Sequence, residues 1–224
     1  MRAVQTWALV VALVLGVDVA IAGLIGPAPV YTAGSAYASA RAPHPMVMGS
    51  DWTLLSDLDD IVRWPCDQTI TVTRIGPAPT GGDEAIAGAL ARLVEVTGLE
   101  MVAGPAQPRQ SNNRWVRGHI TVRYVDSDGA QVEDMNLDTY DAVGLANFQT
   151  SGQAITAGRV VMLGDHPFTD PTTDLGQAVL LHELAHAVGV GHNDNEHGIM
   201  SPWGTETELI DSDRYGLRLL ACPA

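Results

Sequence analysis

The chain has 224 residues, of which 46% are hydrophobic and 17% are charged. This length and composition predict one medium globular domain with an N-terminal segment, and they exclude an intrinsically disordered chain. The formal net charge of −14 argues against a nucleic-acid partner, because neutralising phosphates requires Lys and Arg.

The first segment, residues 1–26, is almost wholly apolar after Arg2. It is either a signal peptide followed by small residues or an uncleaved membrane anchor, since residues 4–25 are long enough to span a bilayer. Asp18 disfavours the anchor, because a carboxylate at the helix centre costs up to roughly 3 kcal/mol. Either alternative places the folded domain outside the cytoplasm, secreted or anchored at the outer face of the cell membrane, because the basic end stays inside.

Residues 27–63 are expected to form a linker or a short propeptide, because they begin with a stretch rich in Pro, Ala and Gly. The folded domain is then expected over residues 64–224. Cys66 and Cys222 lie near its two ends, and in an oxidising compartment such a pair predicts a disulfide. The alternative is that Cys66 is a free thiol that ligates a metal.

Strands and helices alternate along the folded part. Alternating β-branched residues predict strands, and apolar residues at spacings of three and four predict helices. The expected strands are 68–75, 101–103, 119–125, 142–148 and 159–163, and the expected helices are 83–97 and 174–188. This order predicts an α/β (α+β) fold with a mixed, mostly parallel sheet.

The helix over 174–188 is expected to begin at Asp174 as the N-cap, with Gln177 completing a capping box. It carries an apolar stripe that should face the core. The stripe consists of Leu181, Leu184, Ala185 and Val188.

The stretch HELAHAVGVGH carries three of the seven histidines of the chain. His182 and His186 are four residues apart on a helix, so both side chains leave one face and can bind one ion at roughly 2.0–2.1 Å. Glu183 lies close enough to contact a water on that ion without ligating it. Gly189 can end the helix in the left-handed conformation, after which the chain reverses and returns His192 as a third ligand.

This stretch matches the HExxHxxGxxH zinc signature of the metzincin metallopeptidases. Those enzymes also have a methionine in a tight turn below the metal, and Met200 in HGIMSP resembles it. The short interval from His192 to Met200 is similar to that of the matrix metalloproteinases, so the chain resembles a bacterial-type matrixin. The resemblance covers Cys66 to the C-terminus. It implies a twisted sheet with an antiparallel edge strand, two long helices and, after the Met-turn, a C-terminal helix over residues 212–220 that is capped by Asp211.

The resemblance implies the roles of the site residues. Zinc bound by the three histidines would lower the pKa of a water from 15.7 to roughly 7, and Glu183 would serve as general base and then acid in peptide hydrolysis. Met200 would pack below the zinc, with Gly189 as the structural turn. The substrate-binding residues are expected to be Gly144, Leu145 and Ala146 in the edge strand, and Pro202 and Trp203 in the wall of the S1′ pocket.

The sequence also departs from the matrixin pattern. It lacks the cysteine-switch motif, and Asn193 follows the third histidine where matrixins usually have serine. No tyrosine follows Met200 closely, so a fifth tyrosine ligand is not expected.

Further metal sites are open alternatives. Matrixins often bind structural calcium in loops, and His119 and His166 would be the ligands of a second zinc. The aspartates available for calcium are Asp126, Asp128, Asp165, Asp170 and Asp174, although none lies in an EF-hand pattern.

The sequence therefore predicts a monomeric zinc endopeptidase that acts on extracellular proteins or peptides. One alternative is a zinc hydrolase of a non-protein amide in the cell envelope. Another is a binding protein that keeps the fold without turnover, although the intact Glu183 argues against it.

Overall fold

The computed structural model describes residues 61–109, 115–127, 142–193, 197–202 and 206–222, and the backbone of 52–54. The apolar segment over 1–26, most of the predicted linker, and the residues Asp128 and Trp203 lie outside the described residues. Within the described part, no helix is both long enough and apolar enough to cross a membrane.

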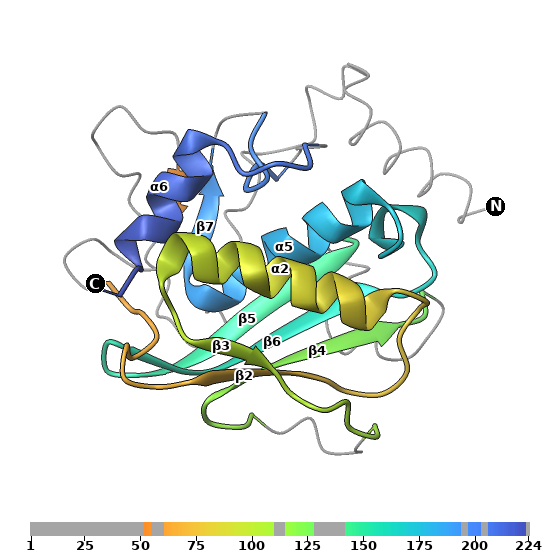
Figure 1. Cartoon of the computed structure of the whole chain (residues 1–224), viewed down its shortest axis with the longest axis horizontal. Coiled ribbons are helices and arrows are strands. Elements are labelled where there is room, and N and C mark those ends of the chain that lie inside the picture. Colours follow the sequence, from red (N-terminus) through yellow and green to blue (C-terminus); the bar gives the residue numbers. More distant parts are fainter. Residues whose placement is uncertain are drawn as a thin grey trace, which may run out of the picture.

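A five-stranded sheet forms the centre of the fold, with the strand order β3-β2-β4-β6-β5 (Figure 1). Strands β2, β3, β4 and β6 pair in parallel, whereas β5 is antiparallel to β6 at one edge. This confirms the predicted α/β class, with a mostly parallel sheet and an antiparallel edge strand. The bounds are β2 Ile70–Arg74, β3 Met101–Ala103, β4 His119–Val125, β5 Gly144–Ser151 and β6 Ala154–Leu163.

Two long helices, α2 (Gly82–Thr97) and α5 (Asp174–Val188), lie over the same face of the sheet and contact each other (Figure 1). A short 3-10 helix, η2 (Pro167–Thr169), precedes α5, and the helix α6 (Asp211–Leu219) follows the site. The core lies between the sheet and the two long helices. It includes Ile120, Val122, Val160 and Met162 from the sheet and the predicted stripe of α5, all 0% exposed.

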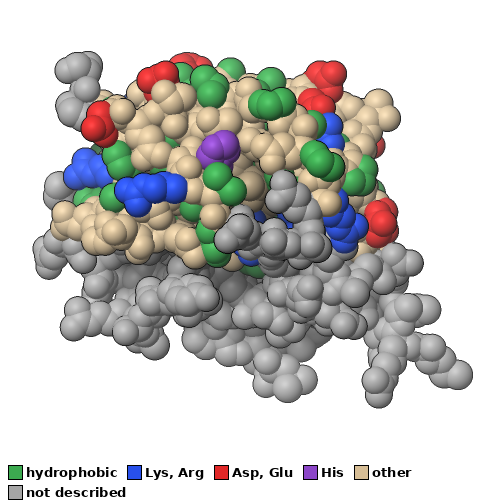
Figure 2. Space-filling view, turned by 90° about the horizontal axis from the view of Figure 1, so that it is seen from below, with side chains coloured by type: hydrophobic (Ala, Val, Ile, Leu, Met, Phe, Trp, Pro, Cys, Tyr) green, Lys and Arg blue, Asp and Glu red, His purple; other side chains and the backbone are tan. Residues whose placement is uncertain are grey.

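The opposite face of the sheet is polar at its centre. The register places Thr73, Thr121, Arg159 and Asn147 in one row across β2, β4, β6 and β5. Arg159 stacks on Trp115, with its guanidinium carbon 4.3 Å from the ring centre. Figure 2 shows the molecule from this side, where the basic and acidic side chains of the described residues are interspersed.

Two strands were not expected from the sequence. Strand β7 (Val190–Asn193) follows α5 directly, and it pairs antiparallel with β1 (Trp52–Leu54), with Leu54 opposite Val190. Strand β1 lies within the predicted linker. Both strands are too short to show an alternating pattern, so tertiary pairing defines them.

The predicted helix caps differ from the observed ones. The N-cap of α5 is Thr173, whose hydroxyl accepts a hydrogen bond from the amide of Gly176 at 3.0 Å, and Asp174 is already helical. The C-terminal helix begins at Asp211, so this residue is not its cap. At α5 both Thr173 and Asp174 suit the cap position by type, whereas the N-cap of α6 is Ile210, which residue type does not predict.

The disulfide Cys66–Cys222 joins the start of the sheet to the residues after α6. This confirms the predicted pairing and excludes Cys66 as a metal-ligating thiol. The amide of Cys222 also donates to the carbonyl of Thr97 at 3.0 Å, which holds the C-terminal segment against the end of α2. A disulfide of this kind is typical of proteins in oxidising, extracellular compartments.

Replacing both cysteines by serine should lower the free energy of unfolding by about 2–5 kcal/mol, because the disulfide restricts the unfolded chain over 156 residues of sequence separation. Urea unfolding of the oxidised wild type and of the double variant measures this loss. A reducing agent should destabilise the wild type but not the variant. Equal stability of the two proteins would contradict the expected contribution.

Candidate metal centre

Three histidines converge where α5 ends and β7 begins. His182 and His186 are one turn apart on α5, and His192 lies on β7. Gly189 makes the reversal between them possible, because its φ of 113° lies in a region that other residues rarely adopt. A Cβ atom at Gly189 would also be only 3.3 Å from the side chain of Ile155.

The ring orientations follow from hydrogen bonds to two main-chain carbonyls. The Nδ1 atom of His182 lies 2.6 Å from the carbonyl oxygen of Ile199, and that of His186 lies 2.7 Å from the carbonyl oxygen of Val190. A carbonyl can only accept, so both Nδ1 atoms carry the proton and both Nε2 atoms have a free lone pair. Backbone atoms thus turn the Nε2 atoms toward one point.

The three Nε2 atoms lie close together. Their separations are 2.9 Å between His182 and His186, 3.1 Å between His186 and His192, and 3.3 Å between His182 and His192. Ligand nitrogens at 2.0–2.1 Å from one zinc in tetrahedral geometry are roughly 3.3 Å apart. The observed separations are near this value, and a cation between the lone pairs would remove their mutual repulsion.

The described residues contain one group of this kind, in which three ligand atoms lie within 4.8 Å of one another. Three imidazoles are a donor set that suits zinc and leaves a fourth position open. Burial lowers the pKa of all three rings, that of His192 to about 3, and repulsion between charged rings adds to this at His186 and His192. The rings are therefore neutral at physiological pH, as metal ligation requires.

Glu183 lies next to His182 on α5 and is only 7% exposed. Burial raises the pKa of its carboxyl group to about 8. The start of β5 lies directly against this side chain, because a Cβ atom on Gly144 would be 2.7 Å from Oε1 and 2.8 Å from Cγ of Glu183. Any larger residue at position 144 would clash with the Glu183 side chain and displace its carboxylate.

The turn at residues 197–202 contacts the segments that carry the three histidines. Met200 is 0% exposed, and its carbonyl accepts a hydrogen bond from the amide of Asn193 at 3.0 Å. The neighbouring Ile199 supplies the carbonyl that orients His182. This turn therefore holds both the α5 side and the β7 side of the histidine group.

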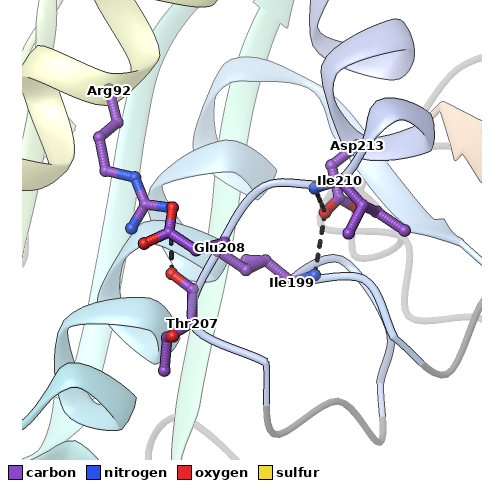
Figure 3. Close-up of polar contacts among 6 residues, drawn as sticks. All are labelled: Arg92, Ile199, Thr207, Glu208, Ile210 and Asp213. Atoms are coloured by element: carbon purple, nitrogen blue, oxygen red, sulfur yellow. Dashed lines mark hydrogen bonds and ion pairs between the residues drawn. The ribbon is translucent and has the colours of Figure 1, made fainter.

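Asp213 on α6 is a residue of this site that the sequence analysis missed. Its carboxylate accepts hydrogen bonds from the amides of Ile199 at 2.9 Å, Met200 at 3.2 Å and Ile210 at 3.1 Å. Figure 3 shows Asp213 between Ile199 and Ile210. No sequence motif indicated this role, because an aspartate in the first turn of a helix is commonly only a favourable charge at the helix dipole.

Arg92 on α2 holds the chain between the turn and α6. Its guanidinium group donates to the carbonyl of Thr207 and contacts the carboxylate of Glu208, both at 3.0 Å (Figure 3). The Glu208 side chain is largely exposed, so the ion pair itself contributes little stability. The hydrogen bond to the Thr207 carbonyl holds the main chain before α6 against α2.

The predicted substrate-binding residues lie in different surroundings. Leu145 faces the outer side of the sheet near Val161, and Ala146 is buried in the main core. Pro202 is exposed after the turn. Gly144 lies directly against Glu183.

The other predicted metal ligands are not brought together among the described residues. Asp165 accepts hydrogen bonds from the amide and hydroxyl of Ser127 at 3.0 and 2.7 Å, and Asp170 accepts from Thr172. His119 lies 3.4 Å from the hydroxyl of Thr73. Neither aspartate belongs to a group of three potential ligands among the described residues, so a calcium site stays a prediction.

The remaining histidine of that set has a local role. The Nδ1 atom of His166 accepts a hydrogen bond from the amide of Phe168 at 3.2 Å, in the first turn of η2. His166 and His119 belong to no ligand group within the described part of the chain. A second zinc at these histidines therefore remains a prediction without a described ligand group.

A family model described as the eCIS core domain matches residues 105–193. The matched region is less than half of the chain, and it runs from the segment after β3 to the last residue of β7, so it includes the three histidines and Glu183. No curated protein matches the chain. The family match and the histidine group together support a metal-dependent, hydrolase-like domain.

The purified chain should bind one zinc ion, and His186→Ala should abolish stoichiometric binding, because two imidazoles hold zinc poorly. His197→Ala is the matched control, since that side chain is 79% exposed and outside the group. Zinc at a hundredfold excess over its Kd should stabilise the wild type by about 2.7 kcal/mol. Metal analysis and thermal unfolding measure both effects, and equal zinc content in His186→Ala and wild type would contradict the site.

Proposed function

We propose that the chain is a zinc-dependent endopeptidase of the matrixin-like metzincin type, which hydrolyses peptide bonds of extracellular proteins. The observation that carries the proposal is the convergence of three Nε2 atoms within 3.3 Å of one another, beside a buried glutamate on the same helix. This combination supports hydrolysis more directly than metal storage, because a storage site has no use for an adjacent proton acceptor.

His182, His186 and His192 would hold the ion in this proposal. Zinc, when bound, polarises a carbonyl and makes a water nucleophilic at neutral pH. The charge of a bound ion would keep the buried Glu183 carboxyl group ionised, so that Glu183 would accept a proton from the attacking water and deliver it to the leaving amine. Its fixed place on α5, one residue from His182, restricts that proton transfer to the immediate neighbourhood of the ion.

The free edge of β5 supports a peptide substrate. Among the described strands, β5 pairs only with β6, so its other edge can bind an extended peptide through backbone hydrogen bonds. Gly144 begins this edge and lies against Glu183, so a peptide bound along the strand would pass close to the carboxylate. Leu145 and Ala146 continue the same edge, and Pro202 with Trp203 would form the wall of the S1′ pocket.

The proposed setting is extracellular. The disulfide supports an oxidising compartment, and we propose residues 1–26 as the signal peptide or membrane anchor and the chain as a monomer. Hydrolysis of a non-protein envelope amide is the second candidate, since the match to the eCIS core domain supports a hydrolase without supporting a peptide substrate. Binding without turnover is the third outcome that the assay can give.

Glu183→Gln should lower casein hydrolysis about 10²- to 10⁴-fold while the zinc content stays unchanged, because it removes the proton acceptor and keeps the shape. A zinc chelator should abolish hydrolysis by the wild type, and added zinc should restore it. Hydrolysis that persists in the variant and in the chelator would refute the peptidase assignment. A zinc-loaded wild type that cleaves amide substrates but not casein would favour the second candidate.

Gly144→Ala should lower hydrolysis roughly 10- to 100-fold, because the new methyl group displaces the Glu183 carboxylate by a distance that matters for catalysis. Zinc content and thermal stability should change little. Gly88→Ala on α2 is the control, since a Cβ atom there has no neighbour within 4 Å. Unchanged activity of Gly144→Ala would show that the close approach to Glu183 has no catalytic consequence.

A further inference from the structure

We propose that Asn193 and Asp213 form a positioning pair that holds two of the three histidines in place and thereby sets the affinity of the site for zinc. The pair acts through the backbone of the turn at residues 197–202 and of β7. This inference rests on the proposed metal site, and it is independent of which bond the site hydrolyses.

Asn193 directly follows His192 on β7 and is 0% exposed. Its amide donates to the carbonyl of Met200 at 3.0 Å, and its side-chain Nδ2 donates to Oδ1 of Asp213. The residue next to the third ligand is thus held by its main chain and by its side chain. A shift of His192 along β7 would break both bonds.

Asp213 is 1% exposed and gathers donors from three segments. It accepts from the Asn193 side chain on β7, from the amides of Ile199 and Met200 in the turn, and from the amide of Ile210 before α6. Only a carboxylate offers two oxygens that accept without donating, so neither Asn nor Ser can replace all four bonds. Burying this group is unfavourable unless its oxygens are satisfied, and here the four donors satisfy them.

The space around the pair is closed. A Cβ atom on Gly198 would be 2.5 Å from Nδ2 of Asn193 and 2.8 Å from Oδ1 of Asp213. The turn therefore approaches the pair so closely that it needs a glycine at this position. Such close packing leaves Asn193 little freedom to move.

The pair is connected to two of the three histidines, His182 and His192, through few bonds. Ile199 donates its amide to Asp213 and accepts at its carbonyl from His182. Asn193 is bonded covalently to His192. His186 is held differently, because its Nδ1 atom donates to the carbonyl of Val190, three residues before Asn193 on β7. Loss of the pair should therefore loosen His182 and His192 more than His186.

The position of Asn193 also explains a departure in the sequence. Matrixins usually have serine after the third histidine, and a serine hydroxyl ends closer to the backbone than the amide nitrogen of asparagine. Serine at this position would leave Asp213 without its donor from β7 unless the strand moved. The asparagine therefore couples β7 to α6 in this chain.

The test measures the zinc affinity of the folded full chain by competition with a chromophoric chelator. Asn193→Ala and Asp213→Asn should each weaken zinc binding about 10- to 100-fold, as losses of outer-shell partners do. The double variant should lose less than the product of the two single effects, because each single change already breaks the same contact. Asn193→Ser is the milder variant if Asn193→Ala folds poorly, and it should also bind more weakly.

Val72→Ala on β2 is the control for a general loss of stability, since Val72 is 1% exposed in the core and belongs to no part of this network. It should lower the urea midpoint of the zinc-free protein and change the zinc affinity less than twofold. Cobalt absorption spectra report the ligand geometry, and they should change in the Asn193 variants and not in the control.

Asn193 and Asp213 variants that unfold more easily but bind zinc within twofold of the wild type would overturn the proposal and leave the pair a purely structural one. Strictly multiplicative effects in the double variant would also overturn it. A wild type that binds no zinc would refute the metal site itself. A wild type that binds zinc without cleaving casein would refute only the peptidase, and the affinity differences would still support the pair.

Discussion

The site depends on where two backbone carbonyls lie. The carbonyls of Ile199 and Val190 fix the protons of His182 and His186 on Nδ1, so that the lone pairs of both rings face the same point as Nε2 of His192. Neither carbonyl belongs to the helix that carries the two histidines. The helix sets the spacing between His182 and His186. The reversal at Gly189 and the turn around Met200 place the carbonyls that orient the two rings. A histidine pair at helical spacing without these two segments would have no preferred ring orientation.

The sequence predicted the parts of the site that depend on local spacing. The apolar stripe of α5, the end of that helix at Gly189 and the four-residue interval between two histidines are properties of one helix, so periodicity was enough to find them. It missed β1, β7 and the role of Asp213, because each depends on segments that are distant in the chain. It also misplaced the cap of α5 by one residue, since Thr173 and Asp174 are both capping residue types and only the backbone geometry shows which of them is the cap.

The region that matches the eCIS core domain ends at residue 193, whereas the supports of the site continue beyond it. The matched region contains all three histidines and Glu183, but Ile199, Met200 and Asp213 follow it. The three candidate ligands and Val190, which orients His186, therefore lie inside the matched region, whereas Ile199, which orients His182, lies outside it. The sheet adds a further constraint, because β5 can lie against Glu183 only while residue 144 has no side chain.

The pairing of β1 with β7 has a consequence for how the protein is handled. The sequence places the start of the folded domain near residue 64, yet residues 52–54 provide the neighbouring strand for the segment that carries His192. A recombinant chain beginning at residue 64 would leave the outward backbone groups of β7 to solvent. Truncation boundaries for crystallisation or enzymology therefore belong upstream of Trp52.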